Sequence, residues 1–318
     1  MTAPAPARQQ PDSGPLGKVP PPVLLGAGIL SVQVGAGVAA RMFGTVSAAG
    51  LTGLRLWAAT ALLAGLGARP AVSAVRSVLA DRAWRDAAVV IAFGITLGIM
   101  NFSIYQAFAR IPLGIAVTIE FLGPLGVAVV LSRRLIDLLW VALASAGVTL
   151  LGIAGVSTAR VGGAPAGPGA ELTGVIFALV AGASWAAYIL LSGSTGRRFR
   201  GPSGLVLAMG IAAVVVTPVA VAGAGRALFR PAVLAAGAAI GLLSSVIPYW
   251  FELEALRRLP ARIFGIWMSL EPAVAALVGV VMLSQALSAA QWLAIGCVIV
   301  ASAGAALGIG RPAAAPQA

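Results

Sequence analysis

Two glutamates stand in the middle of long apolar stretches, where an acid side chain is costly. Glu120 lies in a run that carries no other charge from Ile111 to Leu131, and Glu271 lies in a second apolar run. If these runs cross a bilayer, a charged side chain at their centre costs about 3 kcal/mol or more and marks a substrate or proton pathway. The sequence therefore predicts that both glutamates handle a proton or a cationic group.

A proline follows each of these glutamates. Because proline has no N–H, Pro124 removes the usual donor to the carbonyl of Glu120, and Pro272 does the same to the carbonyl of Met268. We interpret the two sites as helix breaks, at which the freed carbonyl must face protein, water or ligand. The alternative is that the kinks serve packing alone and that the two acids are protonated and hydrogen-bonded.

Two further charges lie in apolar runs. Arg55, within "LTGLRLWAAT", is the lone intramembrane cation. A guanidinium suits a carboxylate, so it either clamps a substrate carboxylate or neutralises one of the glutamates. Glu252, at the inner end of another run, is a proton or substrate contact, or else it snorkels or pairs with Arg257 or Arg258.

The remaining candidates are polar or aromatic residues in the middle of apolar runs. Asn101 and Tyr105 share a helix face at i,i+4, and Trp185 and Tyr188 share one at i,i+3. Tyr249 lies three residues before Glu252. Each of these side chains is a candidate either for the pathway or for a contact that joins two helices.

The composition shows which elements must position these residues. Of 318 residues, 60% are hydrophobic and 9% are charged, whereas soluble proteins carry about 25% charged residues. This composition predicts a polytopic all-α membrane protein. There is no histidine and only one cysteine, which excludes histidine-based acid–base chemistry and internal disulfides. No enzyme motif or metal-ligand spacing is present, so we expect neither an enzyme nor a cofactor.

Ten apolar windows are long enough to cross a bilayer, and nine is the main alternative count. They lie near 23–41, 48–67, 87–107, 112–131, 136–156, 172–192, 203–222, 233–253, 261–283 and 287–308. With the N-terminus inside, fifteen Lys and Arg residues fall on the inner side and five on the outer side. The positive-inside rule then predicts that both termini are cytoplasmic. The net charge of +12 therefore reflects loops at a membrane, and no nucleic-acid partner is expected.

The two halves of the chain share a motif. Pro112 matches Pro260, and "LGP" at 122–124 matches "LEP" at 270–272, both 148 residues apart. Five spans per half is an odd number, so the second copy must be inverted, as in many secondary transporters; chance similarity is the alternative. We therefore predict a disordered tail (1–22), a first repeat (23–156), a linker (157–171), a second repeat (172–308) and a C-terminal tail (309–318).

Several stretches resemble a known family. "NFSIYQAFARIPLGIAVTIEFLGPLGVAVVLSRR" (101–134), "GASWAAYIL" (182–190) and "IPYWFELEALRRLPARIFGIWMSLEPAVAA" (247–276) resemble the EamA-type branch of the drug/metabolite transporter superfamily, near the threonine/homoserine exporters. The resemblance implies ten helices in two inverted five-helix repeats, and export driven by the proton gradient. The candidate residues fall on matching stretches: Arg55, Asn101, Tyr105, Glu120, Trp185, Tyr188, Tyr249, Glu252 and Glu271.

The expected function is proton-coupled export of a small amino acid, threonine or homoserine-like, across the bacterial inner membrane. In this hypothesis Arg55 holds the substrate carboxylate, and Glu120 holds the ammonium group or the coupling proton. The alternatives are efflux of drugs or other metabolites and, less favoured, a passive channel. A small molecule, protons and the bilayer are the expected partners; a homodimer is one option that the sequence leaves open.

Overall fold

The computed structural model describes residues 19–131, 136–154, 169–199 and 203–308, and every regular element in these ranges is helical. Most of the expected N-terminal tail, most of the expected linker and the whole expected C-terminal tail lie outside the described residues. The basic residues of these tails and of this linker therefore lie outside the described residues as well.

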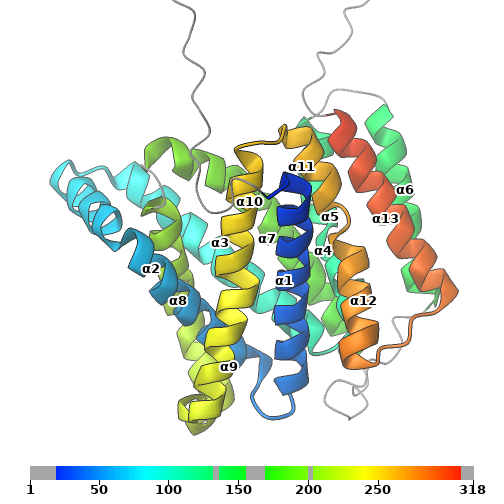
Figure 1. Ribbon diagram of the computed structural model, residues 1–318, viewed down its shortest axis with the longest axis horizontal. Coiled ribbons are helices and arrows are strands. Elements are labelled where there is room, and N and C mark those ends of the chain that lie inside the picture. Colours follow the sequence, from blue (N-terminus) through cyan, green and yellow to red (C-terminus); the bar gives the residue numbers. More distant parts are fainter. Residues whose placement is uncertain (1–18, 132–135, 155–168, 200–202, 309–318) are drawn as a thin grey trace, which may run out of the picture.

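The first part of the chain forms six α-helices (Figure 1). They are α1 (Pro21–Met42), α2 (Ala48–Ala80), α3 (Trp84–Phe108), α4 (Leu113–Glu120), α5 (Leu122–Leu131) and α6 (Ile136–Ala154). The second part follows with α7 (Ala170–Arg198), α8 (Ser203–Ala224), η1 (Gly225–Phe229), α9 (Pro231–Gly241), η2 (Leu242–Val246), α10 (Ile247–Leu256), α11 (Ala261–Met268), α12 (Glu271–Leu283) and α13 (Ala289–Gly308). Of these, η1 is a 3₁₀-helix and η2 is a π-helix.

The helices are those of a multi-pass membrane protein. Within the described ranges, nine helical segments are apolar and long enough to cross a bilayer, and a further apolar segment, Ile136–Leu151, is shorter. α2 continues well beyond its predicted end at residue 67, because the segment after the apolar run remains helical as far as Ala80. The other segments agree with the predicted windows to within a few residues.

Two of the crossing segments are interrupted in the middle. α4 ends at Glu120 and α5 begins at Leu122, while α11 ends at Met268 and α12 begins at Glu271. Both interruptions lie just before a proline, which cannot donate a hydrogen bond to the preceding turn. Each glutamate therefore lies at the end of a half-helix.

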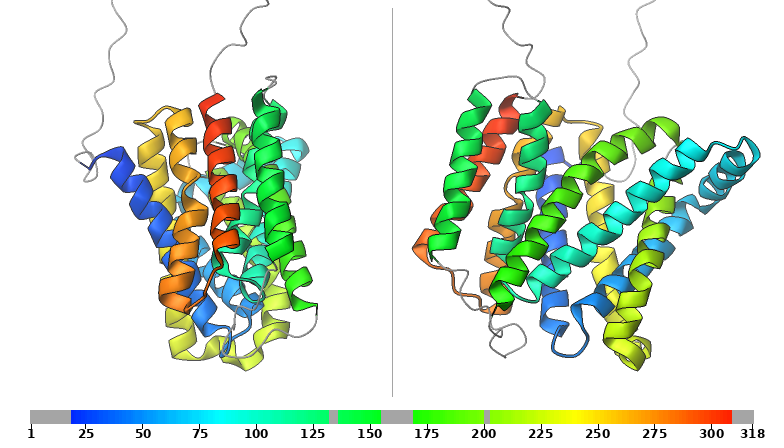
Figure 2. Two further views of the ribbon diagram at one scale, coloured as in Figure 1. Left: turned by 90° about the vertical axis from the view of Figure 1, so that its right-hand side faces the viewer. Right: turned by 180° about the vertical axis from the view of Figure 1, so that it is seen from behind.

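The interrupted helices lie at the centre of the bundle. α4 is buried along its whole length and packs between α12 and α7. α1 packs against α10 and α12, and α3 packs against α7 and α8. α6 and α13 form a pair at one side, and α2 with α8 lies at the other (Figures 1 and 2).

Very small residues allow the central helices to touch. A Cβ at Gly114 would collide with the backbone of Ala276, where α4 crosses α12. A Cβ at Gly182 would lie 2.7 Å from the carbonyl oxygen of Glu120, where α7 crosses the end of α4. Small residues at helix crossings are the usual means of close packing in membranes, and here they bring the two broken helices against each other and α7 against α4.

Candidate functional site

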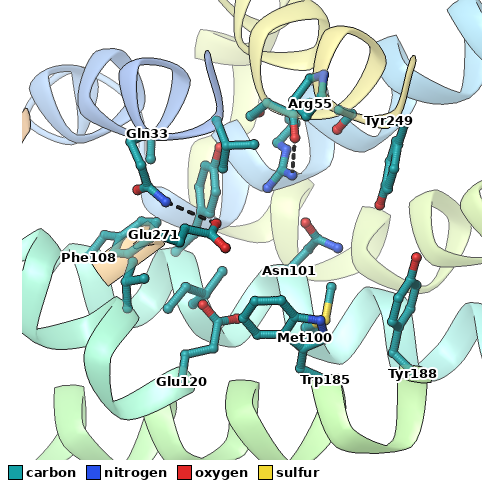
Figure 3. A pocket seen from close by; sticks show the side chains of 18 of the residues that line it. Gln33, Arg55, Met100, Asn101, Phe108, Glu120, Trp185, Tyr188, Tyr249 and Glu271 are labelled. Carbon is teal, nitrogen blue, oxygen red and sulfur yellow. Dashed lines mark hydrogen bonds between the residues drawn. The ribbon is translucent and has the colours of Figure 1, made fainter. Parts of the chain in front are cut away.

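One cavity in the centre of the bundle is lined by all nine candidate residues. Its volume is about 160 Å³, similar to an apolar cavity of about 150 Å³ that holds benzene in another protein. Six helices contribute the candidates: Arg55 from α2, Asn101 and Tyr105 from α3, Glu120 from α4, Trp185 and Tyr188 from α7, Tyr249 and Glu252 from α10, and Glu271 from α12. The structure thus brings together residues that lie far apart in the sequence (Figure 3).

The two mid-span glutamates lie on the same side of this cavity, and their side chains point into it (Figure 3). Glu120 is 9% exposed and Glu271 is 8% exposed. Gln33 of α1 donates a hydrogen bond from Nε2 to Oε1 of Glu271 over 3.1 Å. The other carboxyl oxygen of Glu271 is buried and makes no hydrogen bond. One oxygen of this carboxyl is therefore held by the protein, while the other remains available to a ligand.

Arg55 lies across the cavity from these acids and is held by two contacts (Figure 3). Its Nη2 donates to the carbonyl oxygen of Ser244 over 3.0 Å, and its guanidinium lies 5.2 Å from the ring centroid of Tyr105. Its Nε is buried without a hydrogen-bond partner. Among the ion pairs of the described residues, none involves Arg55. Both sequence interpretations of Arg55, a clamp for a substrate carboxylate and a charge that neutralises a glutamate, therefore stay predictions.

A proline explains why Arg55 is anchored to a backbone carbonyl. Pro248 has no N–H, so the carbonyl one turn earlier lacks its donor. That carbonyl belongs to Ser244 in α-helical register and to Leu243 in the π-helical register of η2. Both are satisfied by side chains of other helices, since Ser31 donates to Leu243 over 2.6 Å and Arg55 donates to Ser244. π-Helical turns of this kind occur often at functional sites.

Two tyrosines lie on the side of the cavity opposite Glu271, whereas Trp185 lies beside Glu120 (Figure 3). Trp185 packs edge-on against Phe121, at 5.1 Å between centroids, directly after the end of α4. Tyr188 and Tyr249 point toward each other from α7 and α10 (Figure 3). Asn101 lies between the aromatic and acidic sides, and its Nδ2 donates to the carbonyl of Leu97 in its own helix.

Glu252 lines the cavity without the partner that the sequence suggested. Arg258 pairs with Glu254 at 2.9 Å, and Arg257 approaches the same carboxylate at 3.6 Å. Neither arginine forms an ion pair with Glu252 among the described residues. Glu252 is therefore an acid of the cavity wall, while Glu254 serves the arginines at the end of α10.

The backbone carbonyl freed by Pro124 packs closely against α7. It faces the Cα of Gly182 on α7, where a side chain would have no room. The sequence allowed this carbonyl to face protein, water or ligand, and its close neighbour in the structure is the protein backbone. The two parts of Glu120 thus differ, since its carboxyl lines the cavity and its carbonyl packs against a neighbouring helix.

Unpaired polar atoms are concentrated at this cavity. The described residues contain eight buried side-chain N or O atoms without a hydrogen bond, and five of them belong to residues of the cavity wall. These five are Gln33 Oε1, Arg55 Nε, Tyr105 Oη, Ser245 Oγ and Glu271 Oε2. Buried polar groups are normally paired, so the concentration indicates a binding site for a polar ligand. The described residues contain no cluster of metal-ligating side chains.

Sequence reasoning missed three polar residues of the site, namely Gln33, Ser244 and Ser245. Gln33 is the one amide side chain in the first apolar run, and that feature could have indicated it. The Ser-Ser pair before Pro248 carried no comparable signal, because serine is common in membrane helices.

A cavity that holds charged side chains between apolar, interrupted helices is typical of multi-pass membrane transporters. The EamA-like transporter family matches residues 172–307. The Threonine/homoserine exporter RhtA of Escherichia coli (strain K12) is 38% identical over 303 residues, covering 92% of this chain and 95% of that protein. Its counterpart in Salmonella typhimurium (strain LT2) is 38% identical over 287 residues, covering 88% and 89%. The chain belongs to the EamA-like transporter family.

A solved protein crystal structure shares the fold. It superposes with a TM-score of 0.55 at 19% sequence identity, covering 90% of this chain and 96% of the other. At this identity the likeness concerns the arrangement of helices alone.

Proposed function

We propose that this protein is a secondary active exporter of small amino acids, resembling threonine or homoserine, that works as a proton antiporter in the bacterial inner membrane. The observation that carries the proposal is the central cavity, which presents a guanidinium on one side and two carboxyl groups on the other. A zwitterionic amino acid has the complementary pair of charges. The relatives described above are named for this class of substrate.

The guanidinium is suited to receive the substrate carboxylate. Arg55 is anchored by the carbonyl of Ser244 through Nη2, while its Nε has no partner in the protein. An anchored guanidinium loses less freedom when it binds a carboxylate than a free side chain would. Glu120, across the cavity, then receives either the ammonium group or the coupling proton.

Proton coupling is assigned to the two glutamates at the helix breaks. Two carboxyl groups on one side of a buried cavity repel each other when both are ionised, and a proton on one of them removes the repulsion. A proton that enters along the membrane potential contributes about 2.3 kcal/mol per 100 mV. Release of the substrate outward and uptake of a proton at Glu120 or Glu271 would complete the exchange.

The two five-helix repeats, 23–156 and 172–308 with the linker 157–171 between them, are also part of the proposal. In this scheme α1 corresponds to α7, α3 to α10 and α5 to α12. The packing of α3 against α7 then matches that of α10 against α1, and the packing of α5 against α7 matches that of α12 against α1. This symmetry of contacts supports ten membrane crossings in two inverted halves.

The membrane orientation is supported by where the helix ends lie. The start of α1, the connection of α2 to α3, the end of α7 and the connection of α10 to α11 lie at the same end of the molecule (Figure 1). These are segments for which the sequence placed arginines on the cytoplasmic side. We therefore assign that end, and with it both termini, to the cytoplasm.

The proposal is tested with purified protein in liposomes. Vesicles loaded with labelled threonine or homoserine should release the amino acid in a saturable manner. A pH gradient with the acidic side outside the vesicle should accelerate the release, because protons then enter as the amino acid leaves. Arg55→Ala should lower transport by roughly ten- to a hundredfold, since a charged hydrogen bond contributes about 1.5–3 kcal/mol. Glu120→Gln should remove the response to the pH gradient. If both variants export like the unmodified protein, the assignment of the site is wrong.

Efflux of larger apolar compounds is the second candidate, and the aromatic side of the cavity favours it. Trp185, Tyr188 and Tyr249 present rings to the lumen. The small volume and the three acids of the wall argue against bulky substrates. Competition with cationic dyes in the same vesicles separates the two candidates, and flux that neither saturates nor responds to a gradient would indicate a passive channel.

A further inference from the structure

The charges of the central cavity do not balance for a simple zwitterion. Three acids, Glu120, Glu252 and Glu271, and one cation, Arg55, line it. A zwitterionic amino acid brings one ammonium group and one carboxylate. Acidic groups therefore outnumber cationic groups in the cavity by the same number whether or not the amino acid is bound. A ligand with one more ammonium group would lower this excess.

Glu252, like Glu120, has no side-chain hydrogen bond among the described residues, whereas Glu271 accepts one from Gln33. The two arginines near it in sequence pair with Glu254 instead. In the described residues Glu252 forms no ion pair. A carboxylate within a membrane segment normally faces a partner or a pathway, and Glu252 faces the cavity.

Glu252 lines the cavity from α10, the helix that also carries Tyr249. It lies three residues after Tyr249 and therefore on the same face of α10. Tyr249 and Tyr188 form the side of the cavity opposite Glu271, and Arg55 lies between the two sides (Figure 3). The carboxyl groups of the helix breaks, the guanidinium and the two tyrosine rings thus follow one another across the cavity, and Glu252 lines it from the helix that carries Tyr249.

The unpaired atoms along this path indicate that it is built for a polar ligand. Ser245 is 1% exposed and Tyr105 is 1% exposed, and the hydroxyl of each has no hydrogen-bond partner. Glu271 retains one unpaired oxygen at the far side. These polar atoms lie in the wall of the cavity that both carboxyl sides share.

We propose that the cavity also accepts short diamino acids, in which a second ammonium group on the side chain binds Glu252. This inference rests on the proposed function. The α-carboxylate lies at Arg55, the α-ammonium lies at Glu120 and Glu271, and the side-chain ammonium reaches Glu252 between the two tyrosine rings. An ammonium group beside a tyrosine ring also gains a cation–π contact.

The test compares homoserine with 2,4-diaminobutyrate, which carries an ammonium group where homoserine has a hydroxyl. Full-length protein in liposomes is assayed by counterflow, with equal potassium on both sides and valinomycin present, so that the net charge of the probe gives no bias. We expect saturable counterflow of both compounds. Glu252→Gln should lower kcat/KM for diaminobutyrate roughly tenfold or more relative to homoserine, because the amide cannot form the charge-assisted contact.

Glu254→Gln is the matched control, since it removes an acid two residues away that pairs with arginines and does not line the cavity. It should leave the ratio between the two probes unchanged. Homoserine counterflow without diaminobutyrate counterflow would overturn this inference and leave the proposed function intact. An equal loss of both probes in Glu252→Gln would overturn the role of Glu252. Absence of counterflow for both probes in the unmodified protein would overturn the proposed function and this inference with it.

Discussion

Replacing Gly182 by alanine should damage the site without touching any side chain that lines it. Gly182 of α7 lies against the backbone of Glu120, and an added Cβ would lie 2.7 Å from that carbonyl oxygen. Ordinary contacts of a Cβ begin at 3.4 Å, which leaves a deficit of 0.7 Å. Because the obstacle is backbone, α7 and α4 must move apart.

The separation should affect both stability and transport. Overpacking of this kind costs about 1–3 kcal/mol. A displacement of about 1 Å between reacting groups can cost roughly a hundredfold in rate, so we expect a loss of about tenfold or more in transport. α7 also carries Trp185 and Tyr188, so the aromatic side of the cavity would move away from Glu120.

Gly196→Ala is the matched control, because it lies in the same helix and a Cβ there meets nothing within 4 Å. Alanine favours a helix over glycine by up to about 1 kcal/mol, so this variant should be at least as stable as the unmodified protein and should transport normally. The assays are the thermal unfolding midpoint of purified protein and threonine or homoserine transport in liposomes. Equal behaviour of the two variants would refute the reasoning. Lower stability with full transport in Gly182→Ala would show that helix spacing does not position Glu120.

Three other substitutions test single contacts of the site and its supports. Gln33→Leu removes the hydrogen bond to Glu271 and should lower transport about tenfold while the protein still folds, which transport and gel filtration together would check. Pro248→Ala supplies an N–H to one of the two carbonyls that Ser31 and Arg55 now occupy, so we expect a higher unfolding midpoint with a higher KM; an unchanged KM would count against the anchor. Gln285→Leu removes the Oε1 that accepts from the backbone N–H of Leu113, the first residue of α4, over 3.0 Å. This substitution should lower stability by about 0.5–2 kcal/mol in a thermal melt.

The apolar runs and the acids within them could be predicted because they depend on composition alone. A run of about 20 apolar residues predicts a membrane helix, and Glu120 and Glu271 stand out in such runs. The interruptions before Pro124 and Pro272 are equally local, because the missing N–H acts within one turn. The sequence also indicated family membership, which the comparison with the exporters from Escherichia coli and Salmonella typhimurium confirmed.

The partners of these residues could not be predicted, because each comes from a distant part of the chain. Arg55 is held by Ser244, 189 positions away, and Glu271 is held by Gln33, 238 positions away. The sequence offered Arg55 a substrate carboxylate or a glutamate, and it gave no sign of the backbone carbonyl that anchors the guanidinium. A carbonyl carries no mark in the sequence, so only the approach of α2 to η2 reveals that it is available.

The sequence by itself determined that this is a helical membrane protein with rare charges at mid-span, because burying a charge or an unpaired backbone group in lipid restricts which residues a span can contain. The tertiary structure decided which of these charges face one another. Close contact of glycines such as Gly182 with neighbouring backbones sets the spacing of the helices. That spacing turns nine scattered residues into the wall of one cavity, since a cavity depends on how helices pack and not on the pattern of any single helix.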